Sequence, residues 1–225
     1  MGTDGDVRTD GATGTVAAGP GGGPATAGAA AGTGDGAPER IGLLEQLKED
    51  VAVNGGLLRP GTQAVVVHRL GAWTRSDAVP PWARVVARRL GTLGHVVIRN
   101  VYGIELPPTT VVGRRVRIAH QNGIVVHPHS RIGDDCIIRQ GVSIGAGMGD
   151  GERFARQAPV LGRGVSVGAG AVVVGGVTVG DEAVIGPNAT VMTNVKPRVR
   201  VLAPPPRMMA LPEAVAQREQ EARGR

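Results

Sequence analysis

The sequence has few of the residues on which most globular cores and many binding sites depend. Among its 225 residues there are two Trp, one Tyr, one Phe and one Cys. Aromatic residues make up only 2%, so the core must be aliphatic, and nucleic-acid bases would find almost no ring on which to stack. A single Cys excludes a disulfide framework within the chain.

Long apolar runs are also missing. The sequence has no stretch of about 18 apolar residues, the length that a membrane-spanning helix requires. Its first residues lack the basic-then-apolar pattern of a secretory signal. These features predict a cytoplasmic protein with no membrane partner.

The charge is unbalanced, with a formal net charge of +6 and a sequence pI of about 10.8. The positive residues are scattered arginines and form no stripe, so we expect no nucleic-acid partner. A basic surface of this kind is equally suited to attract an anionic small molecule.

Glycine is abundant, with 37 residues, and accompanies a repeat with a period of six. Each six-residue unit, or hexad, opens with an aliphatic residue, followed four positions later by a small or β-branched one. This period is typical of hexapeptide β-helices, in which three hexads form one triangular coil and stacked coils bury the openers. The openers are Val112, Ile118, Val126, Ile132, Ile138, Ile144, Leu161, Val167, Val173, Val179, Ile185 and Val191.

Two irregularities interrupt the hexads. The first is a slip of two residues around 120–123, and the second is an insertion of about eleven residues at 147–157. The insertion is polar and rich in glycine, which indicates an exposed loop that marks a binding face. Cys136 falls on a small inward position, so we interpret it as a core residue and not as a nucleophile.

The chain divides into four predicted parts. We expect a disordered tail over 1–40, because its composition cannot bury enough apolar surface to offset the entropy of ordering. A small helical domain follows over 41–103, then the β-helix over 104–202 and a C-terminal tail over 203–225. The predicted helices cover 41–53, a segment capped by Thr62 and ending near 73, 81–101, and a short charged stretch at 211–223.

His120 is the first candidate for a catalytic residue, because it lies at the first slip, where the backbone leaves the regular corner. A histidine can take a proton from a hydroxyl and return it to a leaving group. Glu105 lies fifteen residues earlier, about one coil away, and is the predicted partner of its second ring nitrogen.

The other histidines receive structural interpretations. We interpret His127 and His129 as turn residues on the outer face, and His68 and His95 as structural or surface residues. A zinc site formed by His120, His127 and His129, as in a zinc lyase, is the alternative; because all three fall within ten residues, we predict no metal.

Several short motifs follow one another between about residues 47 and 207. A short helical segment carries Arg59-Pro60-Gly61, Ala64 and His68-Arg69. After it come His120-Gln121-Asn122-Gly123-Ile124-Val125-Val126, then Gln140-Gly141-Val142-Ser143-Ile144-Gly145 and Gly168-Ala169-Gly170-Ala171. In this order the motifs resemble the serine acetyltransferase family. The most specific of them is the one that begins at His120, which is similar to the family's His-x-x-Gly-Ile-Val-Val.

The resemblance implies a left-handed parallel β-helix behind a small helical domain, assembled as a homotrimer or a dimer of trimers. It implies acetyl-CoA as a co-substrate, direct transfer to a small acceptor, His120 as general base and Glu105 as its partner. The remaining residues that it implicates are Gly145, Ala146, Ala169 and Arg207 for coenzyme A, and Asp50 and Gln157 for the acceptor.

The chain departs from the family pattern where the acceptor would bind. Ala119 stands where the family has an acidic residue, and Gln157-Ala158-Pro159 stands in place of Arg-His-Pro. Arg153 or Arg156 could replace the missing arginine, which would meet a carboxylate with two hydrogen bonds. L-serine is therefore the first acceptor to test. The alternatives are a sugar, another hydroxy amino acid or an amine, and, in another class, a non-catalytic trimeric scaffold.

Overall fold

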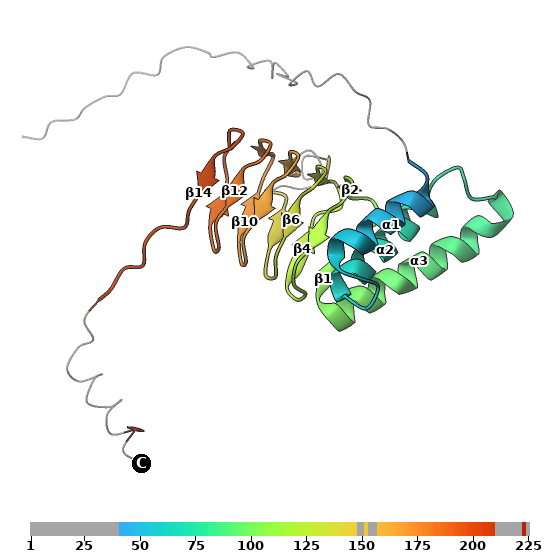
Figure 1. Ribbon diagram of the computed structural model, residues 1–225, viewed down its shortest axis with the longest axis horizontal. Helices are drawn as coiled ribbons and strands as arrows, with labels where there is room; N and C mark the ends of the chain where they lie inside the picture. Colours follow the sequence, from blue (N-terminus) through green and yellow to red (C-terminus); the bar gives the residue numbers. More distant parts are fainter. Residues whose placement is uncertain (1–40, 148–150, 153–156, 210–221, 224–225) are drawn as a thin grey trace, which may run out of the picture. The chain divides into compact units, whose positions relative to one another are not determined.

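The computed structural model describes residues 41–147, 151–152, 157–209 and 222–223. The predicted N-terminal tail over 1–40 lies outside these residues, as does nearly all of the helix predicted over 211–223. In the part that is described, three helices are followed by a series of short strands (Figure 1).

The helices are α1 (Leu43–Asn54), α2 (Pro60–Trp73) and α3 (Pro81–Tyr102). Both α2 and α3 begin with proline, which has no N–H to leave unpaired and whose backbone angle suits a first helical turn. The prediction that Thr62 caps the second helix was wrong. The helix begins two residues earlier, and the Thr62 hydroxyl donates a hydrogen bond of 2.7 Å to the carbonyl of Gly56.

The strands are two or three residues long, as expected for one side of a triangular coil. In chain order they are β1 (Ile104–Glu105), β2 (Val111–Val112), β3 (Arg117–Ile118), β4 (Ile124–Val126), β5 (Arg131–Ile132), β6 (Ile137–Ile138), β7 (Ser143–Gly145), β8 (Val160–Leu161), β9 (Ser166–Val167), β10 (Val172–Val174), β11 (Thr178–Val179), β12 (Val184–Ile185), β13 (Thr190–Val191) and β14 (Arg200–Val201).

Parallel pairing sorts these strands into three sheets (Figure 1). Each of the first four coils contributes one strand to each sheet, and the last coil adds β13 to the first sheet and β14 to the third. The first sheet has the order β1-β4-β7-β10-β13, the second β11-β8-β5-β2 and the third β14-β12-β9-β6-β3. This is the left-handed parallel β-helix that the hexads and the family resemblance predict.

The strand register accounts for both irregularities in the sequence. In regular coils the paired residues are 18 positions apart, as in Val173 and Val191. Ile118 pairs with Ile138, an offset of 20 that includes the two-residue slip. Ile132 pairs with Leu161, an offset of 29, so the loop adds eleven residues and the coils above and below it remain in register.

The core runs through the middle of the coils. Every predicted opener is buried, with exposed fractions of 9% or less, and so are the small inward residues other than Val195. Cys136 is among the buried residues, as predicted, and burial raises the pKa of its thiol to about 11. Stacked aliphatic side chains therefore replace the aromatic core that the composition excludes.

The corner between the third and first sheets turns tightly in successive coils. Gly123, Gly141 and Gly170 have φ values of 68°, 72° and 68°, in the left-handed region that glycine enters without steric cost. They also stack, because a Cβ added to Gly123 would lie 3.3 Å from the Cα of Gly141, and one added to Gly141 the same distance from Gly170. The slip that holds His120 leads directly into this stack.

A buried ion pair attaches the helices to the first coil. Asp50 of α1 is fully buried, and one of its carboxylate oxygens accepts a hydrogen bond of 2.9 Å from Nε of Arg69 in α2. The two other guanidinium nitrogens donate to the carbonyls of Val112 and Gly113, at 2.6 Å and 2.5 Å. Arg69 therefore links both helices to the end of β2.

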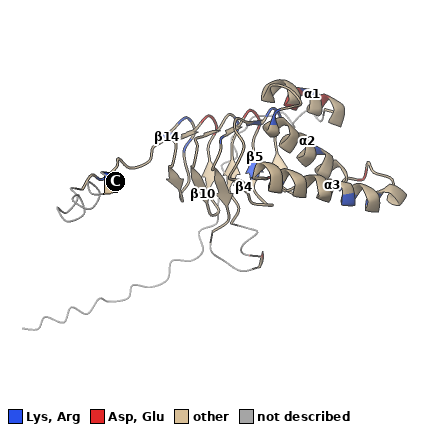
Figure 2. Cartoon of the chain, turned by 90° about the horizontal axis from the view of Figure 1, so that it is seen from below, with Lys and Arg blue, Asp and Glu red and all other residues tan. Residues whose placement is uncertain are grey.

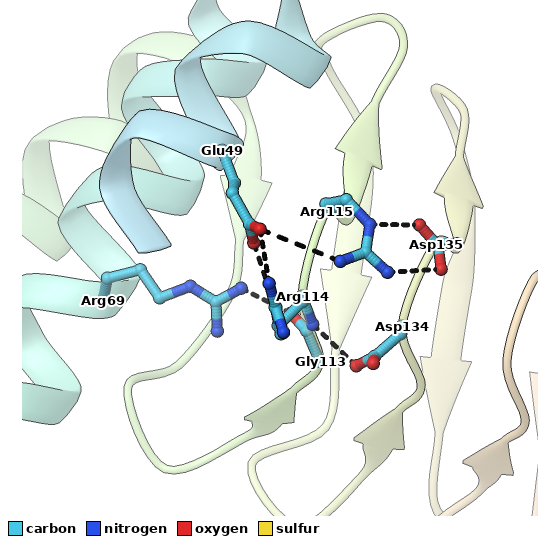
Figure 3. A network of polar contacts seen from close by, with 7 residues as sticks. All are labelled: Glu49, Arg69, Gly113, Arg114, Arg115, Asp134 and Asp135. Carbon is cyan, nitrogen blue, oxygen red and sulfur yellow. Dashed lines mark hydrogen bonds and ion pairs between the residues drawn. The ribbon is translucent and has the colours of Figure 1, made fainter. Parts of the chain in front are cut away.

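A second ionic network lies beside this one, nearer the surface (Figure 3). Arg114 donates two hydrogen bonds to Glu49 of α1, at 2.5 Å and 3.1 Å. Arg115 meets Asp135 of the next coil in the same paired manner, at 2.6 Å and 2.7 Å, and its guanidinium also lies 3.8 Å from Glu49. The network joins α1 to the first two coils.

Positive residues occur on the helices and along the coils, with acidic residues among them (Figure 2). Among the described residues, no helix combines the length and the apolar character that crossing a membrane would need.

Candidate active site

A cleft of about 570 Å³ lies where the end of α1 and the start of α2 meet β3 and the turn after it. Its volume is in the range that suits a small substrate. The cleft is lined by Val53, Asn54, Gly55, Arg59, Pro60, Gly61, Arg117, Ile118, Ala119, His120 and Gln121.

Two residues bring the helices and the coil close together at this cleft. The side chain of Asn54 donates to the carbonyl of Val116 at 3.0 Å and accepts from the N–H of Ile118 at 2.9 Å. Gly61 packs so closely on β3 that an added Cβ would lie 2.3 Å from the carbonyl oxygen of Ile118. The wall made by α2 is therefore fixed against the wall made by β3.

His120 lies on the turn between β3 and β4, and its side chain is exposed to solvent. Two arginines line the same cleft. Arg59 is the residue immediately before α2, and Arg117 is the first residue of β3. In the part of the chain that the structure describes, neither arginine forms an ion pair with an acidic side chain.

Glu105 lies in β1, where it pairs in register with Val125 of β4. Strand β4 follows directly from the turn that carries His120, so the two predicted partners are on neighbouring coils. No hydrogen bond joins them among the described residues. Glu105 instead acts on His95 of α3, where its charge partly offsets the burial that lowers the pKa of that imidazole.

The four residues predicted to bind coenzyme A lie on later coils than His120. Gly145 ends β7 and is followed by Ala146, while Ala169 precedes β10, the strand that pairs with β7. Gly145 and Ala169 are thus at opposite ends of neighbouring strands. A Cβ added to Gly145 would meet no atom within 4 Å, so its backbone faces open space. Arg207 is exposed in the extended segment after β14.

The two residues predicted to bind the acceptor are not brought together in the cleft. Asp50 is buried against Arg69; burial raises its pKa, although Arg69 opposes the shift. Gln157 lies at the end of the inserted loop, and a Cβ added to Gly147 at the loop's start would lie 2.7 Å from its Oε1. Arg153 and Arg156 are outside the described residues.

The remaining histidines have structural positions. The imidazole of His68 is buried, and its Nδ1 donates to the carbonyl of Pro107 at 3.0 Å. The prediction that His127 lies on the outer face was wrong, because the residue is buried, with 8% of its surface exposed. The same prediction agrees with His129, which is exposed. In the described ranges, no three His, Cys, Asp or Glu side chains are grouped in a way that could hold a metal ion.

Arg59 and Arg117 line the cleft without having been predicted as site residues from the sequence. Arg59 stands in the Arg59-Pro60-Gly61 motif but was given no role in a site, Arg117 has no motif around it, and the two are far apart in the chain. The available signals were weak: Arg59 precedes the Pro-Gly start of a helix, and Arg117 occupies an outward position next to the opener Ile118.

The stacked hexads and the cleft on their first coil place the chain in the class of hexapeptide-repeat transferases. The family model described as bacterial transferase hexapeptide (six repeats) matches residues 158–192. The soybean serine acetyltransferase apoenzyme has a similar fold, with a TM-score of 0.61 and 25% identity, over 74% of this chain and 69% of that one.

Relatives of known name narrow the class to a family. The serine acetyltransferase of Helicobacter pylori (strain ATCC 700392 / 26695) is 36% identical over 157 residues, covering 68% of this chain and 85% of that protein. The serine acetyltransferase of Mycobacterium tuberculosis (strain ATCC 25618 / H37Rv) is 37% identical over 147 residues, or 65% of this chain, which spans only 59% of that protein's length. The chain belongs to the serine acetyltransferase family.

Proposed function

We propose that this chain is an O-acetyltransferase that moves the acetyl group of acetyl-CoA directly to a small hydroxyl acceptor, with L-serine as the first candidate. The observation that carries the proposal is the position of His120 in a cleft closed on two sides, at the motif most specific to the family. An exposed imidazole at such a cleft can reach the hydroxyl of a bound acceptor.

In the proposed reaction His120 acts as general base. It accepts the proton of the acceptor hydroxyl while that oxygen attacks the carbonyl carbon of the thioester. The carbon–sulfur bond then breaks, and the thiolate of coenzyme A receives the proton from His120. Positioned proton transfer of this kind is typically worth about 10² to 10⁴-fold in rate.

Other residues would support this step. We assign Glu105 as the partner that orients the second ring nitrogen of His120, because its strand β1 adjoins the strand that follows the histidine turn. Backbone amides would stabilise the oxyanion. Gly145, Ala146, Ala169 and Arg207 would bind coenzyme A, and the open backbone face of Gly145 suits the close approach of a pantetheine arm.

From the family resemblance we infer that the chain assembles as a homotrimer or as a dimer of trimers. The apolar side of α3 supports subunit contacts, because it leaves large side chains uncovered in one chain. Those exposed by at least 60% are Trp82, Val85, Val86, Leu90, Leu93 and Val101.

The decisive experiment measures thiol release from acetyl-CoA by the full chain and by His120→Ala, with L-serine and with a panel of sugars, hydroxy amino acids and amines. We expect release to require an acceptor, and His120→Ala to lower kcat by about 10² to 10⁴-fold. His129→Ala is the matched control, since this exposed histidine lies outside the cleft and should leave kcat unchanged.

The outcomes separate the alternatives. Acceptor-dependent release with a sugar or an amine in place of serine would keep the transferase and change its substrate. No acceptor-dependent release with any compound would favour a non-catalytic scaffold. Tightly bound zinc, with activity lost on its removal, would favour the zinc lyase.

A further inference from the structure

The cleft beside His120 has an unbalanced charge. Its lining contains two arginines and one histidine, and none of the lining residues is acidic. The arginines come from opposite walls: Arg59 lies at the start of α2 and Arg117 at the start of β3. Since neither has an acidic partner among the described residues, their guanidinium groups are available to an anion in the cleft.

The two walls of the cleft that carry Arg59 and Arg117 are held against each other by close contacts. Gly61 of α2 is in close contact with Ile118 of β3. Gly61 is two residues after Arg59 and Ile118 is next to Arg117, so this contact fixes the backbone near both arginines. The two hydrogen bonds of Asn54 with Val116 and Ile118 hold the same strand to α1. The backbone that carries the two arginines is therefore in place before a ligand binds between them. This preorganisation lowers the entropy cost of binding.

The position of the cleft indicates which substrate these arginines meet. The residues assigned to coenzyme A follow His120 in the stack: β7 is in the third coil, Ala169 precedes the fourth, and Arg207 follows the last strand. The helices pack against the first coil, on the side of His120 away from the residues assigned to coenzyme A. The space between His120 and α2 is therefore left for the acceptor.

We propose that Arg59 and Arg117 bind an anionic group on the acceptor and so bring its hydroxyl to His120. The inference rests on the proposed function and names the substrate class: a small hydroxyl compound that carries a carboxylate or phosphate within the reach of the cleft. A guanidinium can meet such a group with two parallel hydrogen bonds, which fixes both its place and its orientation.

The proposal separates binding of the anion from the chemistry at His120. Arg59→Gln and Arg117→Gln remove one charge each and keep a polar side chain. With L-serine, each substitution should lower kcat/KM by about 10- to 100-fold, mainly through KM, because one charge-assisted contact is lost. With L-serinamide, which has the hydroxyl but no carboxylate, the same substitutions should leave kcat/KM unchanged.

Arg89→Gln provides the matched control, because this exposed arginine of α3 is outside the cleft lining and its loss changes the net charge equally. If L-serine is not a substrate, the same comparison uses the best acceptor of the panel and its uncharged amide or ester. Arg117→Lys should recover only part of the activity, since an ammonium keeps the charge and loses the fork.

Three results would overturn the proposal while leaving the transferase intact. Equal losses with the charged and uncharged acceptors would show that the arginines do not read the anion. A change in the KM for acetyl-CoA alone would assign them to the coenzyme's phosphates. Unchanged kinetics in both variants would remove them from the site. Failure of the proposed function itself is distinct, because the unmodified chain would then transfer acetyl to no acceptor.

Discussion

At the scale of single residues, burial decides the chemistry of several titratable side chains. His68 is 3% exposed, and burial, helped by the neighbouring charge of Arg69, lowers its pKa from 6.5 to about 4. The folded protein thus holds this imidazole neutral, with Nδ1–H donating to Pro107. Its protonation is linked to unfolding, because the unfolded chain binds the proton more tightly.

The stability that His68 contributes is therefore complete above pH 6.5 and is lost as the pH falls from 6.5 towards 4. The linked loss reaches about 3 kcal/mol. We expect His68→Asn, whose amide can donate to the same carbonyl, to lose less stability than the unmodified chain between pH 7.5 and 4.5. Urea unfolding at both pH values measures this difference, and parallel losses would contradict it.

At the scale of elements, β3, the first strand of the third sheet, has a neighbouring strand on one side only. Strand β3 is at the edge of its sheet, and an edge strand presents backbone groups that seek partners. Asn54 provides them, since its amide accepts from Ile118 and donates to Val116 as an adjoining strand would. The last residue of α1 therefore extends the sheet by one rung.

Asn54→Ala should destabilise the fold by about 1–3 kcal/mol for each backbone group left unsatisfied. Asn54→Asp keeps the acceptor for Ile118 and loses the donor to Val116, so its loss should be intermediate. Denaturant unfolding gives the free energies, and hydrogen exchange at the Ile118 amide gives the local effect. An Asn54→Ala variant with unchanged stability and unchanged exchange would show that water replaces the side chain at no cost.

At the scale of the whole molecule, the described helices and coils belong to one compact unit. Among the ion pairs of the described residues, Asp50–Arg69 is the most deeply buried; it joins α1 to α2, and Arg69 also donates to the carbonyls of Val112 and Gly113. We infer that this contact makes the helices and the first coil unfold together.

Arg69→Met should be costly, because it leaves a buried carboxylate and two carbonyls without their donor. A loss of about 3–5 kcal/mol is typical when one member of a buried pair is removed. Hydrogen exchange should show α1 and α2 opening before the coils in this variant, whereas the unmodified chain protects them together. Asp50→Leu combined with Arg69→Met should recover part of the stability, and a double variant no better than Arg69→Met would contradict this account.

The fold could be predicted from the sequence because its information is local and repeated. Each aliphatic opener indicates an inward position, and the glycine-rich corners indicate the turns. The irregularities at 120–123 and 147–157 therefore appear as breaks in an otherwise constant period of six. The helices were visible from their apolar spacing and from the prolines at their starts.

The candidate site was less predictable, because it depends on contacts between distant segments. Spacing could suggest that Glu105 is near His120, yet it could not reveal that the helix α3 brings His95 within electrostatic range of the same carboxylate. Asp50 was predicted to bind the acceptor, and no local signal showed that Arg69 encloses it. Arg59 and Arg117 line the same cleft only because α2 docks on β3.

The buried position of Cys136 has a practical consequence for work on this protein. It is the only thiol in the chain, it lies fully buried between the coils, and its pKa of about 11 keeps it protonated at neutral pH. Thiol reagents react with the thiolate, so the folded protein should contribute almost no background to a colorimetric assay of released coenzyme A. For the same reason, a cysteine introduced at an exposed position could carry a single spectroscopic label without first replacing the native one.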